Sequence, residues 1–116
     1  MFFPDSQVNI WLYGKPADMR KSFDGLIALA KNHMQCDPLS GHLFAFINRR
    51  QTQMKILYFD RSGFCLWSKR LEAGRFQYDP KKGEKQALSV IDLKLILEGI
   101  DTQKIIQRKR FKLPDT

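Results

Sequence analysis

Three apolar segments joined by two short polar turns constrain the fold more than any other feature of the chain. They are His42–Asn48, Met54–Phe59 and Phe64–Leu71, each with the length and composition of a β-strand. The residues between the last two, Asp60–Gly63, suit a tight hairpin turn because glycine adopts positive φ angles without strain. Connections this short join neighbouring antiparallel strands, so the middle of the chain is predicted to be an antiparallel meander.

Two further segments extend the predicted sheet. Val8–Tyr13 alternates, with Val8, Ile10 and Leu12 on one side, and is expected to close the meander at an edge. Arg75–Tyr78 is expected to be a short additional strand. The sheet is therefore predicted to have about four or five strands.

Two helices complete the predicted architecture. Apolar residues at three- and four-residue steps predict a helix over residues 18–34, with Asp18 as its N-cap. Ser89 is the expected N-cap of a second helix near residues 89–98, and the stretch before it, Asp79–Gln86, is predicted to be a mobile loop. The fold class is therefore α+β: an antiparallel sheet with the first helix across one face and the second, near the C-terminus, at its side or end.

Charge is distributed unevenly along the chain. The first 48 residues hold as many acidic as basic side chains, so the whole formal net charge of +8 lies in residues 49–116. A localised positive field favours polyanions: nucleic acid first, an anionic membrane surface or an acidic protein second. A solvated surface that only promotes solubility would have the same composition. Residues 1–100 are expected to form a single domain and residues 101–116 a basic C-terminal tail.

Catalytic and metal sites are not predicted. Cys36, Cys65, His33 and His42 lack the spacing of a zinc site, so we expect no metal and no other cofactor. No nucleophile has the base and third group of a catalytic triad, and the carboxylates fall mainly at caps and turns, so we expect the protein not to be an enzyme. The sequence shows neither a membrane-spanning run nor a secretory signal, and a cytoplasmic location without membrane association is expected.

Basic side chains interleaved with aromatic ones in the β-rich region are the strongest functional signal. Bases that neutralise phosphates beside aromatics that stack on nucleobases are typical of a sheet that binds nucleic acid. Trp67 is expected to belong to the core, which makes the basic residues the better candidates. Arg20 and Lys21 are included because the first turn of a helix favours anions. The candidate nucleic-acid-binding residues are Arg20, Lys21, Arg49, Arg50, Lys55, Lys69, Arg70 and Arg75.

Several motifs between Val8 and Tyr78 resemble those of a known family. The segments that carry the resemblance are Asp18–Leu26, Asp37–Phe44, Asn48–Arg50, Lys55–Tyr58 and Gly63–Phe76. In this order they resemble the small Orf2-like (TnpB) accessory proteins of the bacterial insertion-sequence family sixty-six, which are distinct from the RNA-guided nucleases that share the name TnpB. The resemblance implies a protein encoded beside a separate, larger DDE-type transposase and used with it in transposition. It implies no catalytic residues.

Three functions are compatible with the charge and the resemblance. The leading hypothesis is a non-catalytic accessory protein that binds DNA, at the ends of the element, through a basic surface and assists the transposase. The alternative is a protein-interaction module that docks on the transposase, or on other proteins of the element, without contacting DNA. The third is a phosphoryl-transfer enzyme that uses Asp24 and Asp60, the best-placed acids. The sequence makes no prediction of the oligomeric state.

Overall fold

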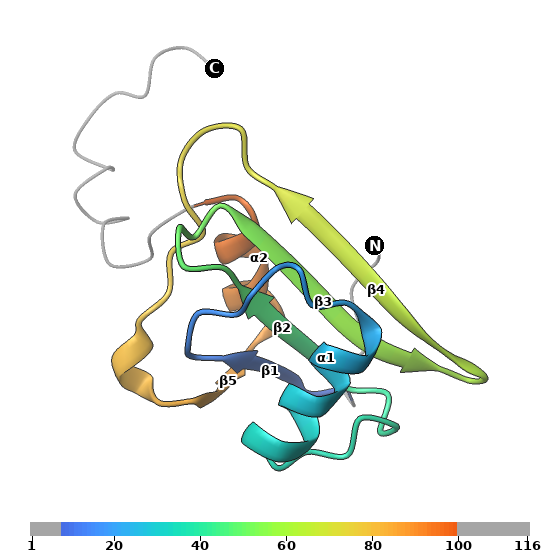
Figure 1. Cartoon of the computed structure of the whole chain (residues 1–116). Coiled ribbons are helices and arrows are strands. Elements are labelled where there is room, and N and C mark those ends of the chain that lie inside the picture. The colour runs from blue at the N-terminus through green and yellow to red at the C-terminus, as the bar shows by residue number, and fades with distance from the viewer. Residues whose placement is uncertain (1–7, 100–116) are drawn as a thin grey trace.

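The fold is built around a sheet whose strands come from both halves of the chain. The computed structural model describes residues 8–99, and its elements are shown in Figure 1. In chain order they are β1 (Ile10–Tyr13), α1 (Phe23–Ala28), the π-helical turn η1 (Leu29–His33), β2 (Leu43–Ile47), β3 (Gln53–Asp60), β4 (Gly63–Arg70), the 3₁₀ turn η2 (Pro80–Lys82), β5 (Lys85–Leu88) and α2 (Val90–Leu97).

The sheet has five strands in the order β4-β3-β2-β1-β5. β2, β3 and β4 form the antiparallel meander that the sequence predicts, with Phe44 opposite Leu57 in the first pair. β1 runs parallel to β2, with Ile10 opposite Leu43, and antiparallel to β5. The predicted α+β class is confirmed. The sheet, predicted to be antiparallel, is mostly antiparallel, and the parallel β1–β2 pair is the exception.

Two strand predictions and one loop prediction are wrong. The segment 8–13 contains β1, but β1 lies inside the sheet because β5 covers its outer side. β5 begins within residues 79–86, which were predicted to be a mobile loop. Residues 75–78 form no strand and belong to the irregular connection between β4 and η2. The parallel pair of β1 and β2 needs a long crossover, which the segment carrying α1 supplies.

β5 is anchored by Gln86, a polar side chain that is buried. Its Nε2 donates to the carbonyl oxygens of Asp79 (2.8 Å) and Gly83 (2.9 Å). The side chain thus ties β5 to the preceding connection through hydrogen bonds rather than through apolar burial. A short strand held in this way lacks the apolar alternation that identifies strands in a sequence.

Each face of the sheet is covered by one helix (Figure 1). On one face, α1 and η1 pack against buried residues that include Phe44 and Leu57. On the other, α2 places Leu93 and Ile96 in a cluster with residues of β1, β2 and β3. The first helix crosses one face as predicted, whereas the second covers the opposite face instead of docking at the side or end. Trp67, which was expected to belong to the core, is half-buried and packs against the α2 cluster from outside the fully buried core.

The first helix is shorter than the predicted span of residues 18–34. α1 begins at Phe23, and its π-helical continuation ends at His33. Asp18 caps no helix: its Oδ1 accepts from the backbone N–H of Arg20 (2.9 Å), and its carboxylate binds the guanidinium of that residue. This local arrangement holds the chain in a turn before the helix starts.

The second helix agrees with the prediction for residues 89–98. Ser89 Oγ accepts from the N–H of Asp92 (3.0 Å), and the Asp92 carboxylate accepts from the N–H of Ser89 (3.1 Å), which completes a capping box. None of the helices in residues 8–99 has the length and apolar character needed to cross a bilayer. Residue 100 and the predicted tail 101–116 lie outside the described residues.

Gly14 is expected to be intolerant of a side chain. A Cβ there would collide with the carbonyl oxygen of Gly83 and approach Gln86 Nε2 to 2.8 Å, so the chain before β5 would have to move. Gly14→Ala is therefore expected to lower the free energy of unfolding by about 1–3 kcal/mol, measured by urea denaturation. Gly63→Ala is the matched control, because nothing lies within 4 Å of a Cβ at that position. Equal stabilities of the two variants would contradict this expectation.

Candidate nucleic-acid interface

The turn between β2 and β3 is shaped by Asn48. Its Oδ1 accepts from the backbone N–H groups of Thr52 (2.9 Å) and of the next residue (3.0 Å), and its Nδ2 donates to Thr52 Oγ1 (3.2 Å). Gln51, with a φ of 60°, donates its N–H to the carbonyl of Asn48 (3.0 Å). These bonds fix the turn that carries Arg49 and Arg50, whose side chains are exposed.

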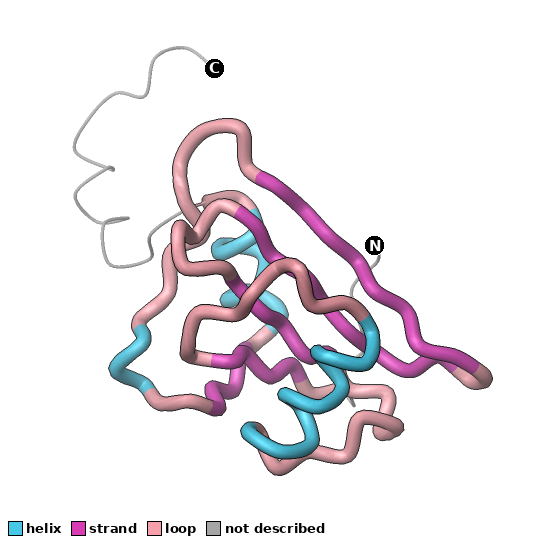
Figure 2. The backbone as a smooth tube through the Cα atoms, in the orientation of Figure 1, coloured by secondary structure: helices cyan, strands magenta, loops and turns pink. Residues whose placement is uncertain are grey.

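The connection after β4 is fastened to this turn. The N–H of Leu71 donates to the Thr52 carbonyl (2.8 Å), and the N–H of Phe76 donates to the Gln51 carbonyl (2.7 Å). Gln51 Nε2 returns a bond to the Phe76 carbonyl (3.0 Å). Figures 1 and 2 show the connection arching back from β4 toward the turn. Because Phe76 is fully buried, the preceding Arg75 is held at the surface, where it is exposed.

Arg49, Arg50 and Arg75 are exposed at this end of the sheet and are termed the arginine surface. Within residues 8–99, none of the three forms an ion pair. Burial raises the pKa of Tyr78, and the positive charge of Arg49 acts in the opposite direction, which places Arg49 near this ring. A guanidinium offers several N–H donors in a planar fork that matches phosphate and carboxylate oxygens. The arginine surface is therefore suited to recognise oxyanions.

Lys55 and Lys69, two predicted binding residues, direct their ammonium groups to backbone carbonyls. Lys55 Nζ donates to the carbonyls of Met19 and Lys21 (2.8 Å each), which fastens the segment before α1 to β3. Lys69 Nζ donates to the carbonyl of Leu97 (2.9 Å), at the C-terminal end of α2, where the helix dipole favours a positive charge. Both side chains therefore stabilise the fold.

Arg20 and Arg70 form exposed ion pairs with Asp18 (2.6 Å) and Glu72 (3.1 Å). Hydrogen bonds from Arg20 lower the pKa of Asp18 to about 2. The prediction that Arg20 and Lys21 occupy the first turn of a helix is wrong, because α1 begins after both. The backbone before α1 is fastened to β3 instead. Lys21 is exposed.

The eight predicted residues nevertheless surround one end of the sheet, where β2 ends and β3 begins. Ala17 donates its N–H to the carbonyl of Ile47 (2.9 Å), which brings the segment before α1 to this end. Arg70 lies opposite Gln53, the first residue of β3. Four of the eight side chains, those of the arginine surface and of Lys21, form no ion pair or hydrogen bond in the part of the chain that the structure describes. The other four have partners there.

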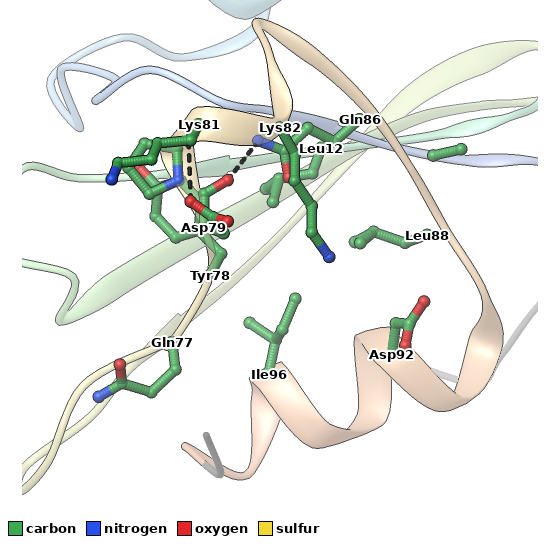
Figure 3. A pocket seen from close by; sticks show the side chains of 12 residues that line it. Leu12, Gln77, Tyr78, Asp79, Lys81, Lys82, Gln86, Leu88, Asp92 and Ile96 are labelled. Carbon is green, nitrogen blue, oxygen red and sulfur yellow. Dashed lines mark hydrogen bonds between the residues drawn. The ribbon is translucent and has the colours of Figure 1, made fainter. Parts of the chain in front are cut away.

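A cavity of about 510 Å³ lies between residues 77–82, β5 and α2 (Figure 3). Its lining joins apolar side chains such as Leu88 and Ile96 to Tyr78 and Lys82, and Figure 3 shows the Lys82 side chain extending into it. Lys82 is not among the predicted binding residues, because it lies in the predicted loop. Its position in a pair of adjacent lysines was the available signal.

The side chains that could bind a metal ion or catalyse phosphoryl transfer do not gather in one place within the described residues. Among residues 8–99, no three His, Cys, Asp or Glu side chains are placed to hold a metal ion. Asp24 lies in the first turn of α1, and Asp60 lies at the β3–β4 hairpin, so the two acids considered for phosphoryl transfer belong to different elements. The arrangement offers anion recognition by exposed guanidinium groups.

A sequence model of the family described as IS66 Orf2 like protein matches residues 8–107. The chain belongs to this family. This IS66 Orf2-like protein is accordingly a transposition-associated accessory protein of an insertion sequence, associated with components of the transposase system. The match extends beyond Phe76, the last residue of the motifs that carry the resemblance, and takes in β5 and α2.

Two relatives come from Sinorhizobium fredii. The uncharacterized protein y4jC is 32% identical over 114 residues, which cover 98% of this chain and 97% of y4jC. The uncharacterized protein y4hO is 35% identical over 94 residues, which cover 81% of this chain and 82% of y4hO. No solved structure matches the chain significantly.

Asn48→Ala is expected to destabilise the turn that carries the arginine surface. It removes three hydrogen bonds of a part-buried side chain and leaves the N–H of Thr52 without its acceptor. The expected loss is about 1–3 kcal/mol of unfolding free energy, read from urea denaturation. Asn48→Asp keeps the acceptor oxygen and is expected to lose less. If Asn48→Ala were as stable as the wild type, the side chain would not hold this turn.

The carboxyl pKa of Asp18 reports on its pair with Arg20. It is expected at about 2 in the wild type and closer to its ordinary value of 3.8 in Arg20→Ala. Because folding depresses this pKa, the pair contributes stability above the unfolded pKa, and that contribution is lost as the pH falls toward 2. Carboxyl-detected NMR titration measures both values, with Arg70→Ala as the control that leaves Asp18 unchanged. A wild-type value near 3.8 would contradict the pair.

Proposed function

We propose that this IS66 Orf2-like protein binds DNA through the arginine surface, at the ends of its element, and so assists the separate transposase. The observation that carries the proposal is three exposed guanidinium groups that form no ion pair within residues 8–99. Such groups bind phosphate without first breaking an internal pair. They come from two segments, the β2–β3 turn and the connection after β4, that are fastened to each other.

The backbone beneath these arginines supports the proposal. The two bonds between Gln51 and Phe76 (2.7 and 3.0 Å) and the bonds of Asn48 fix the backbone on which the arginines lie. Binding then orders side chains only, which limits the entropy lost on association. A fixed turn also presents the same arrangement of charge to every DNA molecule that it meets.

The other predicted basic residues have supporting roles in this proposal. Lys21 is exposed beside Lys55 and is an additional phosphate contact. Arg20 and Arg70 form ion pairs that are exposed to solvent, and solvent weakens such pairs, so a phosphate can replace the carboxylate as the partner of either guanidinium. Lys55 and Lys69 hold backbone carbonyls and add to the positive field.

The proposed contacts are to phosphates, because the aromatic side chains nearby are committed to the core. Phe76 is fully buried and Trp67 is half-buried against the α2 cluster, so neither presents a free ring for base stacking. Phosphate contacts set the position of a protein on DNA without reading the sequence directly. We therefore expect weak discrimination between element ends and unrelated DNA by this protein alone.

A salt titration of DNA binding tests the proposal. If about five phosphates are contacted, the logarithm of the binding constant falls against the logarithm of salt with a slope of about −4 to −5. The double variant Arg49→Gln/Arg50→Gln is expected to weaken binding to all duplexes and to make the slope shallower by about 2. Fluorescence anisotropy between about 50 and 200 mM salt, with an element-end duplex and an unrelated duplex, measures both effects.

Lys31→Gln/Arg61→Gln is the matched control, because it removes the same charge from η1 and from the β3–β4 hairpin. It is expected to change the slope less. Equal losses in the two double variants would exclude the arginine surface as the site. No binding of the wild type at low salt would exclude direct DNA binding, and co-purification with the transposase after nuclease treatment would then favour the docking alternative.

A further inference from the structure

β4 forms an edge of the sheet that has no strand on its outer side within residues 8–99. All eight of its residues pair with β3, from Gly63 opposite Asp60 to Arg70 opposite Gln53. β3 and β4 are longer than the other three strands. Figures 1 and 2 show β4 running along the outside of the sheet.

The free edge presents unpaired backbone groups at alternate residues. Leu71 donates its N–H to the Thr52 carbonyl across the continuation of the β3–β4 pair. In an antiparallel pair, hydrogen bonds recur at every second residue, so the odd-numbered residues of β4 direct their N–H and C=O groups toward β3. The groups directed toward the free edge belong to Phe64, Leu66, Ser68 and Arg70.

The middle of this edge is apolar on both faces. Phe64 and Leu66 lie on the α1 face, Cys65 and Trp67 lie on the α2 face, and all four are half-buried. β4 contributes no residue to the fully buried core of the described chain, because the helices cover β1, β2 and β3. Edge strands are usually protected by charge, proline or a bulge in the strand. In β4 the charged residues, Lys69 and Arg70, lie only at the C-terminal end, and the apolar stretch before them is suited to pairing.

We propose that β4 is an interface strand and that it pairs antiparallel with β4 of a second copy of this chain. Two five-stranded sheets would then join into one continuous sheet. In such strand addition, backbone hydrogen bonds supply affinity and the alternating side chains supply specificity. The proposal does not depend on DNA binding by the arginine surface, which lies on the turn and connection beyond the end of β4.

The order of residues along β4 is complementary to itself. A two-fold axis midway between the two copies of Leu66, perpendicular to the sheet, keeps the α1 faces of both copies on one side and the α2 faces on the other. It sets Lys69 of one copy opposite Gly63 of the other and Arg70 opposite Ser62, so no like charges face each other. The same axis sets residues whose N–H and C=O groups point to the free edge opposite each other, with Leu66 opposite Leu66 and Phe64 opposite Ser68 of the second copy. The half-buried apolar side chains of the two strands then cover one another.

The basic residues of β4 favour a second copy over an acidic partner. Lys69 is bound to the carbonyl of Leu97 within the chain, which leaves Arg70, in an exposed pair with Glu72, as the single remaining charged side chain of β4. Each copy carries a formal net charge of +8, and association has to overcome this repulsion. Dimer formation is therefore expected to strengthen as salt screens the charges, whereas a complex with an acidic partner would weaken.

Sedimentation of the purified full chain over a range of concentrations and salt tests the dimer. We expect a monomer–dimer equilibrium that shifts toward dimer at high protein and high salt. Amide hydrogen exchange of the wild type supplies a second measurement. The N–H groups of Phe64, Leu66 and Ser68 are expected to gain protection as concentration rises, whereas those of Cys65 and Trp67 are protected by β3 at every concentration.

Ser68→Pro is the decisive variant, because it removes an N–H that points to the free edge. Proline is tolerated on edge strands when its nitrogen faces solvent, so the β3–β4 pairing is retained. We expect its dimer dissociation constant to rise at least about tenfold, and Ser68→Ala, which keeps the N–H, to dimerise like the wild type. If Ser68→Pro does not fold, the concentration-dependent amide exchange of the wild type tests the dimer in its place.

Three results would overturn the proposal. One is a wild-type chain that stays monomeric at all concentrations and salt conditions. Another is a dimer that Ser68→Pro leaves as tight as before. The third is a dimer whose new exchange protection falls outside the alternate residues of β4. Binding of an acidic peptide to β4 by a chain that does not self-associate would assign the edge to a different partner and would also refute the second copy.

Discussion

Five consecutive buried residues, Leu43–Ile47, form β2, and covering both faces of this strand is the constraint on which the rest of the structure depends. A helix covers only one face of a sheet, so the chain supplies α1 for one side and α2 for the other. The backbone of β2 also needs a partner on each edge, because buried N–H and C=O groups are costly when unpaired. β3 takes one edge as a hairpin neighbour, and β1 takes the other in parallel orientation.

Local sequence predicts the parts of this arrangement whose partners lie nearby in the chain. The apolar segments of the meander and the turn at residues 60–63 predict β2, β3 and β4, because short connections leave one pairing available. The capping box at Ser89 is likewise a local pattern, and it marks the start of α2. The position of β1 is different, because its partners are β2 and β5, both far along the chain. Nothing in residues 8–13 distinguishes an edge from the interior of a sheet.

The candidate site divides in the same way. Composition and motif position select the basic residues, and the structure brings them around one end of the sheet. The bonds of Lys55 and Lys69 were not predictable, because their acceptors are backbone carbonyls of Met19, Lys21 and Leu97, and every residue has such a carbonyl. The bonds from Lys55 to the carbonyls of Met19 and Lys21 also account for the shortened first helix. Aspartate is a preferred N-cap residue, so Asp18 predicts a helix start, yet the segment that follows it is fastened to β3.

The arginine surface is held by groups other than its own side chains. Its turn and connection are joined by the main chain of Phe76, by Gln51 and by Asn48, and no bond of the guanidinium groups takes part among the described residues. In these segments, the main chain and the side chains of Gln51 and Asn48 maintain the fold, whereas the guanidinium groups are left for binding a ligand. Evolution of an element can alter the chemistry at Arg49, Arg50 and Arg75, and with it the preferred ligand, while the underlying scaffold keeps its stability.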